Sequence, residues 1–255
     1  GCAKTTTVLN LAYSLSQMGK KVLAVDFDAQ ANLTTGFGVE NPKEIETTIA
    51  ELMDLGIKDE SIPDKSEYIM NHNGVDFIPS SISLSAIDMK LQQSTIFSEV
   101  TLSDILEPLR DDYDYILIDT CPSLGNLTIN ALTAADDVII TVNPQFWGMM
   151  GVDDLLTTIA KIKKKINPVL NVKGILLTMC NTRTNLYKLI MEEVKATFDG
   201  KIRIFSTHIP MTVKLGESVY YGLSIEEYAS NSSAGKAYIT FAKELNKIYE
   251  EEQAC

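Results

Sequence analysis

The sequence has few of the residues from which metal and disulfide sites are usually built. Only two histidines, His72 and His208, occur in 255 residues, so we expect no histidine-based metal site. The four cysteines stand far apart and form no C-x-x-C pair. This spacing is typical of reduced thiols and argues against a zinc site or a disulfide framework. We therefore expect a cytoplasmic protein.

Long apolar runs, internal repeats and low-complexity stretches are also missing. No run of about 18 consecutive apolar residues occurs, so we expect no membrane-spanning helix. The net charge of −12 argues against a surface coated with DNA-binding groups, although it leaves room for a local basic patch. A composition of 45% hydrophobic and 22% charged residues is that of an ordinary globular protein.

What the chain does contain is an alternation of short apolar runs and amphipathic stretches. The apolar runs predict strands at 21–26, 75–79, 113–119, 137–142, 172–179 and 201–205. The amphipathic stretches predict helices at 5–18, 45–55, 83–93, 102–110, 127–135, 152–166, 186–198 and 234–251. Alternation of this kind predicts the α/β class, with a mostly parallel central sheet and helices on both faces. Because no linker is visible, we expect residues 1–255 to form a single domain.

The first seven residues, Gly-Cys-Ala-Lys-Thr-Thr-Thr, have the character of a phosphate-binding loop that leads into a helix. Backbone N–H groups of such a loop close on phosphate oxygens, and the helix N-terminus adds positive partial charge. Lys4 is expected to reach the β- and γ-phosphates, and the Thr5 hydroxyl to ligate Mg²⁺. Ala3 stands where the pattern has glycine, and alanine adopts positive φ poorly, so we expect a strained or reshaped loop. Lys4-Thr5 alone is equally compatible with an ordinary helix start.

Three acids, Asp26, Asp28 and Asp119, fall at the ends of the expected strands at 21–26 and 113–119, where parallel sheets bind ligands. Asp119 is placed to hold the Mg²⁺ shell through water; the alternative is a cap for the next helix. Asp28 is placed to orient or deprotonate an attacking water; the alternative is a solvated loop acid. Asp26 could support the metal or Lys4 from its strand end.

Taken together, these motifs resemble the ParA/Soj partition ATPases, the branch with a deviant phosphate-binding loop that also includes MinD. The likeness runs nearly end to end and is most specific over the first two thirds. It is carried by residues 2–7, 10–12, 25–28, 30, 32–35, 119–125 and 130–132, with further matches at 144–145, 151 and 181–185. The resemblance implies a P-loop fold of the SIMIBI type and a slow, partner-stimulated ATPase that uses ATP and Mg²⁺. It also implies a cytoplasmic, nucleoid-associated homodimer that sandwiches ATP between its subunits.

The resemblance also implies roles for individual residues. Lys4 and Asp28 would be catalytic, and Thr5 and Asp119 would hold the metal. The nucleotide would be bound by Gly1, Cys2, Ala3, Lys4, Thr5 and Thr6, with Asn181 and Pro210 near the adenine. Asn181 is equally compatible with a simple turn former. The family's loop has a further lysine, so we expect Lys-Gly directly before Gly1, preceded by a central strand.

The resemblance further implies sequence-independent DNA binding in the ATP state and a ParB-like adaptor that stimulates hydrolysis. Contacts of this kind go to phosphates and are sensitive to salt. We expect them from Arg183, Lys188 and Lys214. The lysines at 161 and 163–165 are further candidates, although a solvated helix face explains them better.

Three alternatives stay open at this stage. A MinD-like ATPase that cycles on membranes would end in a basic amphipathic helix, whereas residues 249–255 are acidic, so we expect no membrane partner. A nucleotide-binding regulator with little turnover would fit Ala3. A metabolic phosphate-loop enzyme of the dethiobiotin synthetase kind would need a small-molecule pocket that the sequence does not reveal.

Overall fold

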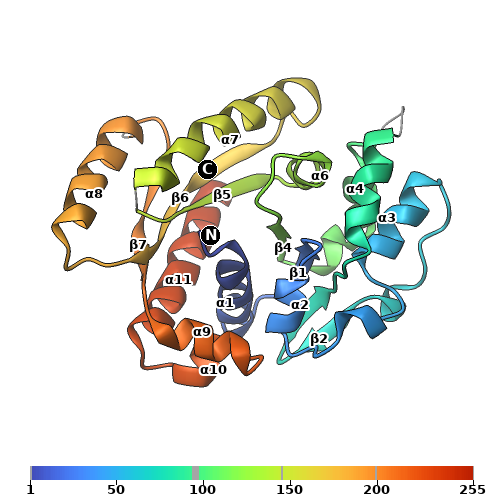
Figure 1. The fold of residues 1–255 in the computed structure, drawn as a ribbon, viewed down its shortest axis with the longest axis horizontal. Coiled ribbons are helices and arrows are strands. Elements are labelled where there is room, and N and C mark those ends of the chain that lie inside the picture. The colour runs from blue at the N-terminus through green and yellow to red at the C-terminus, as the bar shows by residue number, and fades with distance from the viewer. Residues whose placement is uncertain (1, 94–97, 145, 199, 255) are drawn as a thin grey trace.

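A computed structural model describes residues 2–93, 98–144, 146–198 and 200–254 and shows an α/β fold in three layers (Figure 1). Parallel strands form the middle layer and helices cover both faces, as the alternation of elements predicts. In the described ranges, no helix combines the length and the hydrophobicity needed to cross a bilayer.

The first sheet has four strands in the order β2-β3-β1-β4. These are β2 (Met70–His72), β3 (Val75–Ile78), β1 (Val22–Phe27) and β4 (Tyr115–Thr120). Strand β1 runs parallel to β3 and β4, whereas β2 is antiparallel to β3. In the β1–β4 register Asp26 lies opposite Asp119, so the two acids meet at the carboxyl edge of the sheet.

The second sheet has three parallel strands in the order β5-β6-β7. These are β5 (Asp137–Val142), β6 (Asn171–Cys180) and β7 (Ile204–Pro210). Hydrogen bonding between the described strands stops at β4 on one side and at β5 on the other. The central layer therefore consists of two sheets with unpaired edges at its middle.

Eleven α-helices lie within the described ranges. They are α1 (Lys4–Gln17), α2 (Asn32–Gly36), α3 (Ile49–Ile57), α4 (Leu84–Gln93), α5 (Thr101–Leu106), α6 (Asn126–Ala134), α7 (Phe146–Lys165), α8 (Asn185–Phe198), α9 (Val213–Tyr220), α10 (Ile225–Ala229) and α11 (Ser233–Gln253). Three short 3₁₀ helices, Pro42–Glu44, Lys65–Glu67 and Glu107–Asp112, complete the elements.

Helices α1 and α11 hold the two sheets together. One hydrophobic core joins these helices to Val22 of the first sheet and to Leu176 and Phe205 of the second. On the opposite face, α3, α4, α5 and α6 cover the first sheet, while α6, α7 and α8 cover the second. Burial of apolar side chains across the α1–α11 face therefore keeps both sheets in one unit.

The differences from the expected elements have local causes. Helix α3 begins at Ile49, later than expected, because Thr48 forms a capping box with Glu51. The expected strand at 201–205 is instead Ile204–Pro210, where buried and exposed residues alternate as on a half-covered edge strand. Helices α2, α9 and α10 and strand β2 are too short for the sequence periodicity to indicate them.

Candidate functional site

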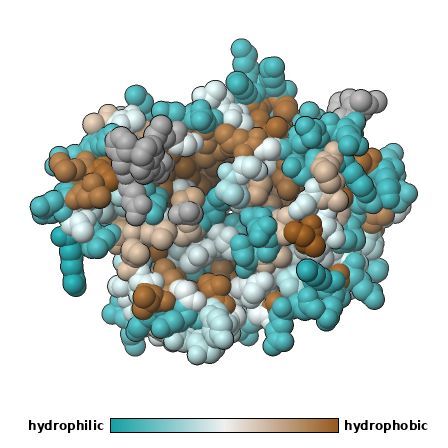
Figure 2. Space-filling model, viewed as in Figure 1, coloured by the Kyte–Doolittle hydropathy of each residue, from teal (hydrophilic) through white to brown (hydrophobic). Residues whose placement is uncertain are grey.

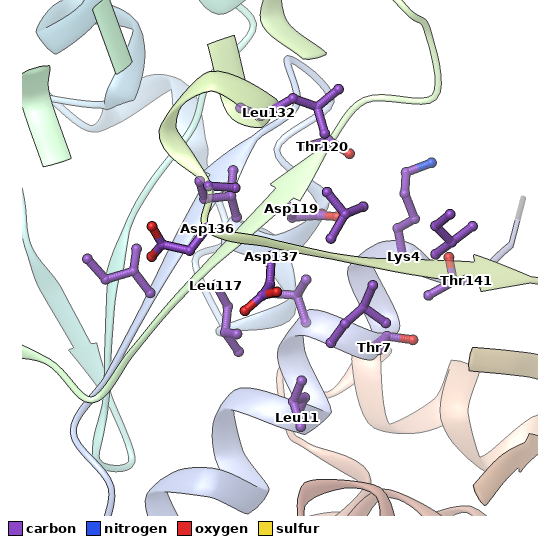
Figure 3. Close-up of a pocket in the computed structure, with 18 of the residues that line it drawn as sticks. Lys4, Thr7, Leu11, Leu117, Asp119, Thr120, Leu132, Asp136, Asp137 and Thr141 are labelled. Atoms are coloured by element: carbon purple, nitrogen blue, oxygen red, sulfur yellow. The ribbon is translucent and has the colours of Figure 1, made fainter. Parts of the chain in front are cut away.

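A cavity of ≈ 840 Å³ occupies the space between β4 and β5. Its walls carry apolar side chains from the strands and from helices on both faces, among them Leu11, Ile118, Leu132 and Ile139. Figure 2, which has the same view as Figure 1, shows hydrophobic residues in a recess near the middle of the molecule. Lys4 and Asp119 lie toward one end of this channel, and Asp136 lies toward the other (Figure 3).

The start of α1 forms the polar end of the channel. Ala3 is the N-cap residue with φ 56° and ψ 37°, and no side chain caps the helix. The carbonyl of Cys2 accepts a hydrogen bond from the Thr178 hydroxyl at 3.0 Å, which ties the loop to β6. The uncapped N–H groups of the first turn, together with the helix dipole, make this end suited to an anion. The left-handed backbone of Ala3 is the strained conformation that the sequence predicts.

Asp119 is the last residue but one of β4, and 1% of its surface is exposed. Neither of its carboxylate oxygens has a hydrogen-bond partner among the described residues. The pKa of Asp119 is raised to about 7, mainly by burial and to a smaller extent by Asp26 and Asp28, while the nearby Thr5 hydroxyl and Lys4 oppose the rise. A buried carboxylate without a partner fits the shell of a hard cation such as Mg²⁺.

Asp26 and Asp28 occupy the end of β1 and the loop after it. Asp26 is fully buried, and burial raises its pKa to about 6 against the hydrogen bonds that it accepts from Thr34 and from the Asp28 backbone. Asp28 is partly buried, and its Oδ1 accepts a hydrogen bond from the Gln30 N–H at 3.0 Å. The Asp28 backbone is therefore tied to Asp26 through its own N–H, while the Asp28 carboxylate bonds within the loop.

The structure brings together most of the residues that the sequence nominates. Lys4, Thr5, Asp26 and Asp28 all lie close enough to Asp119 to influence its pKa. Cys2 and Lys4 line the channel, and Ala3, Thr5 and Thr6 lie between and beside them in the same loop and first helical turn. Gly1 falls outside the described residues.

The remaining nominated residues follow β6 and β7, on the same carboxyl side of the second sheet. Asn181 and Pro210 are neighbours there, because Cys180 pairs with Pro210 and its carbonyl accepts from the Met211 N–H at 3.0 Å. Arg183, Lys188 and Lys214 are exposed, and none of them forms an ion pair within the part of the chain that is described. None of these five residues lines the channel.

Two buried hydroxyls of the site were not predicted from the sequence. Thr178 interrupts the apolar run of β6 and anchors Cys2. Thr34 is fully buried and donates to Asp26. A polar residue inside an apolar strand is a signal that could have indicated Thr178, whereas nothing in the local pattern distinguishes Thr34 from its neighbour Thr35.

Comparisons with known proteins agree with this geometry. A family described as an AAA domain matches residues 1–172. The sporulation initiation inhibitor protein Soj of Bacillus subtilis is 39% identical, with 96% of this chain and 94% of that protein covered. The chromosome partitioning protein ParA of Caulobacter vibrioides is 33% identical, with 100% and 93% covered.

A solved structure gives the same result for the fold. Cobyrinic acid a,c-diamide synthase from Mycobacterium smegmatis, with bound ATP analog and magnesium, superimposes with a TM-score of 0.83 at 29% identity. The match covers 98% of this chain and 91% of the other. The phosphate-loop start of α1, the acids at the ends of β1 and β4, and these relatives lead to one conclusion: the chain belongs to the AAA-domain family of P-loop ATPases and, within it, to the Soj and ParA group.

Proposed function

We propose that this protein binds ATP with Mg²⁺, hydrolyses it slowly and uses the cycle to partition DNA. The observation that carries the proposal is the pairing of an uncapped helix start with a buried, unpartnered carboxylate, Asp119. One feature suits phosphate and the other suits the metal that accompanies it. The names of the Soj and ParA relatives support the same cellular role.

The proposed chemistry assigns one task to each group. Lys4 neutralises the β- and γ-phosphates, and the first-turn N–H groups of α1 hold their oxygens. Thr5 and Asp119 would hold Mg²⁺, which supplies charge neutralisation on the phosphates. Asp28 orients the attacking water and accepts its proton. Since most of the barrier in phosphoryl transfer is lowered by positioning and electrostatics, these few groups suffice.

The proposed cycle is that of a switch in the cytoplasm, associated with the nucleoid. ATP closes a homodimer around the nucleotide, and the dimer binds DNA without sequence preference through Arg183, Lys188 and Lys214. A ParB-like adaptor then stimulates hydrolysis and releases the dimer. The exposure of these three cations, outside any ion pair of the described residues, supports a role in binding phosphates. Asn181 and Pro210 are proposed to contact the adenine.

Calorimetric titration with Mg-ATP tests the central claim. We expect saturable binding by the native protein and loss of that binding in Lys4→Ala, because the phosphates lose their cation. Lys20→Ala, which removes a channel-lining lysine at the other end of α1, is the matched control and should bind like the native protein. Absence of binding by the native protein would overturn the proposal. Binding without phosphate release, even with DNA and the adaptor present, would favour a non-hydrolysing regulator.

We also propose that residues 1–255 belong to a single domain whose channel receives a β-strand from the segment directly N-terminal to Gly1. Strands β4 and β5 present unpaired edges to the channel, and each has six residues. The channel walls are apolar on both faces, as a buried parallel strand requires. Cys2, tied to Thr178 near the end of β6, lies where a strand parallel to its neighbours would leave the channel.

Hydrogen exchange tests this proposal in a polypeptide that carries the natural residues before Gly1. The amides of β4 and β5 should be as protected as those of β1, which is paired on both edges. In the chain that begins at Gly1, the same amides should exchange faster because one edge of each strand is open. Equal, fast exchange of β4 and β5 in both polypeptides would contradict the proposed strand.

A further inference from the structure

The two ends of the loop that carries Asp28 donate hydrogen bonds to one buried carboxylate, that of Asp26. Oδ1 of Asp26 accepts a hydrogen bond from the Asp28 N–H at 3.3 Å. Oδ2 of Asp26 accepts two more, from the Thr34 N–H at 2.8 Å and from the Thr34 hydroxyl at 2.7 Å. Both ends of the segment from Asp28 to Thr34 are therefore fastened to the end of β1.

The Thr34 hydroxyl also connects the loop to a second strand. It accepts a hydrogen bond at 2.9 Å from the N–H of Ser80, just beyond β3, and both residues are fully buried. Strand β3 pairs with β1, so the loop is braced by two neighbouring strands of one sheet. A hydroxyl can donate to Asp26 and accept from Ser80 at once, whereas valine of similar shape can do neither.

Asp28 has no comparable anchor of its own. Among the described residues, its carboxylate accepts only from the Gln30 N–H within the same loop. Ala31 turns the chain through a left-handed conformation at φ 51°. The placement of the Asp28 carboxylate therefore depends on the two fixed ends of the loop. Loss of the Thr34 hydroxyl would leave this end of the loop held to Asp26 by the Thr34 N–H alone and would leave the buried Ser80 N–H without its partner.

We propose that Thr34 is a positioning residue, which holds the Asp28 loop in the geometry needed for hydrolysis. The proposal rests on the proposed function, since it assigns Thr34 to the step that Asp28 performs. Thr34 touches neither the phosphates nor the metal in this scheme, so its hydroxyl should matter for turnover and not for nucleotide binding. Small displacements of a catalytic group carry large losses in rate, so the predicted effect is readily measured.

Steady-state ATPase assays with DNA and adaptor present, together with Mg-ATP titrations, test the proposal in the full-length protein. Thr34→Val should lower kcat about tenfold to 100-fold while leaving KM and Kd for Mg-ATP within about threefold. Thr34→Ser, which keeps the hydroxyl, should restore most of the native kcat. Thr35→Val is the matched control, because the Thr35 hydroxyl is exposed and donates only to the Ala31 carbonyl of its own helix. We expect Thr35→Val to have native kcat.

Each contrary outcome is informative. Native kcat in Thr34→Val, an equal loss of ATP affinity, or failure of Thr34→Ser to restore turnover would overturn the positioning role. If Thr34→Val does not fold, hydrogen exchange of the native protein tests whether the loop is fixed. The proposal predicts that the Asp28 and Thr34 amides are protected as well as those of β1, and fast exchange of these two amides would overturn it. Asp28→Ala separates this proposal from the proposed function. An inactive Asp28→Ala with an active Thr34→Val rejects the positioning role alone, whereas an active Asp28→Ala rejects the catalytic role of Asp28 itself.

Discussion

The carboxyl edges of the two sheets differ in the regularity of strand pairing and in the burial of their residues. In the first sheet β1 and β4 pair over six residues without a shift, and their acids are almost fully buried. In the second sheet the pairing of β6 with both neighbours is interrupted, and the residues that follow β6 and β7 are exposed. Charges that take part in chemistry need a rigid, dry setting, whereas surfaces that bind large partners need access. The comparison divides the protein into a half suited to catalysis and a half suited to binding.

The second half also exposes apolar side chains near its cations. Met211 is 65% exposed, and Val213 is 79% exposed at the start of α9, next to Lys214. The first half keeps the groups beside its acids buried: Thr34 and Ser80 have no exposed surface. Changes at the first edge should therefore alter turnover and stability, and changes at the second edge should alter association.

The largest expected effect concerns Asp28. Asp28→Ala should retain Mg-ATP binding and dimerisation but lose about 100-fold or more in hydrolysis, because the water loses its base. A phosphate-release assay beside a Mg-ATP titration measures both quantities. Asp59→Ala, at an exposed loop acid far along the chain, serves as the control and should hydrolyse normally. Unchanged turnover in Asp28→Ala would contradict the assignment of hydrolysis to the carboxyl edge of the first sheet.

The next effect is a pH dependence of stability that Asp119 produces. Its folded pKa, about 7, lies above the unfolded value of 3.8, so the native state binds the extra proton. Without Mg²⁺, the contribution of Asp119 should therefore favour folding at pH 4 and be lost as pH rises toward 7, by an amount on the order of 1 kcal/mol or more.

Urea unfolding of the native protein and of Asp119→Asn, in EDTA at several pH values between 4.5 and 7.5, isolates this contribution. The difference in unfolding free energy between the two proteins should shift in favour of Asp119→Asn as pH rises. Added Mg²⁺ should recover stability of the native protein at pH 7.5 and have less effect on the variant. A difference that does not change with pH would contradict the raised pKa.

A smaller effect is expected from relief of strain at the start of α1. Ala3→Gly should raise the free energy of unfolding by about 1 kcal/mol, because glycine adopts the left-handed conformation without a steric penalty. Thermal and urea unfolding measure the change. Ala237→Gly is the control, since Ala237 lies inside helix α11, where glycine should lower stability by about 1 kcal/mol. Destabilisation by both substitutions would show that the Ala3 backbone carries no strain.

The smallest effect belongs to the second edge. Lys214→Glu should weaken retention of ATP-loaded protein on DNA about threefold at low salt and reduce the salt dependence, because a phosphate contact is lost. ATP hydrolysis without DNA should stay native. Lys201→Glu makes the same charge change before β7, at the opposite edge of the sheet, and should leave DNA retention unchanged. Equal weakening by both variants would indicate a general charge effect and not a contact at this edge.

Much of the first half could be predicted from the sequence. The run that ends in Asp26 and the run that ends in Asp119 are apolar and short, so strand, direction and edge follow from local pattern and from the rules for parallel sheets. Strand β5, of the second sheet, was also predicted with its observed bounds, Asp137–Val142. The helix after Lys4 ends near Gly19, whose φ of 81° is the left-handed conformation in which glycine commonly ends a helix.

The second half and the bracing of the site were less predictable. Strand β7 was placed too early, because its alternating edge pattern gives no continuous apolar run. The function of Thr34 depends on Ser80, which is distant in the sequence and is brought close only by the pairing of β3 with β1.

The sequence by itself determined the class of fold, the phosphate-loop start of α1 and the strand ends that carry the acids, because these depend on short-range composition and periodicity. Tertiary structure alone decided the burial that raises the pKa values of Asp26 and Asp119 and the anchoring of the Asp28 loop. The physical reason is that burial and hydrogen-bond partners are set by which distant segments pack together, and a local pattern holds no information on that choice.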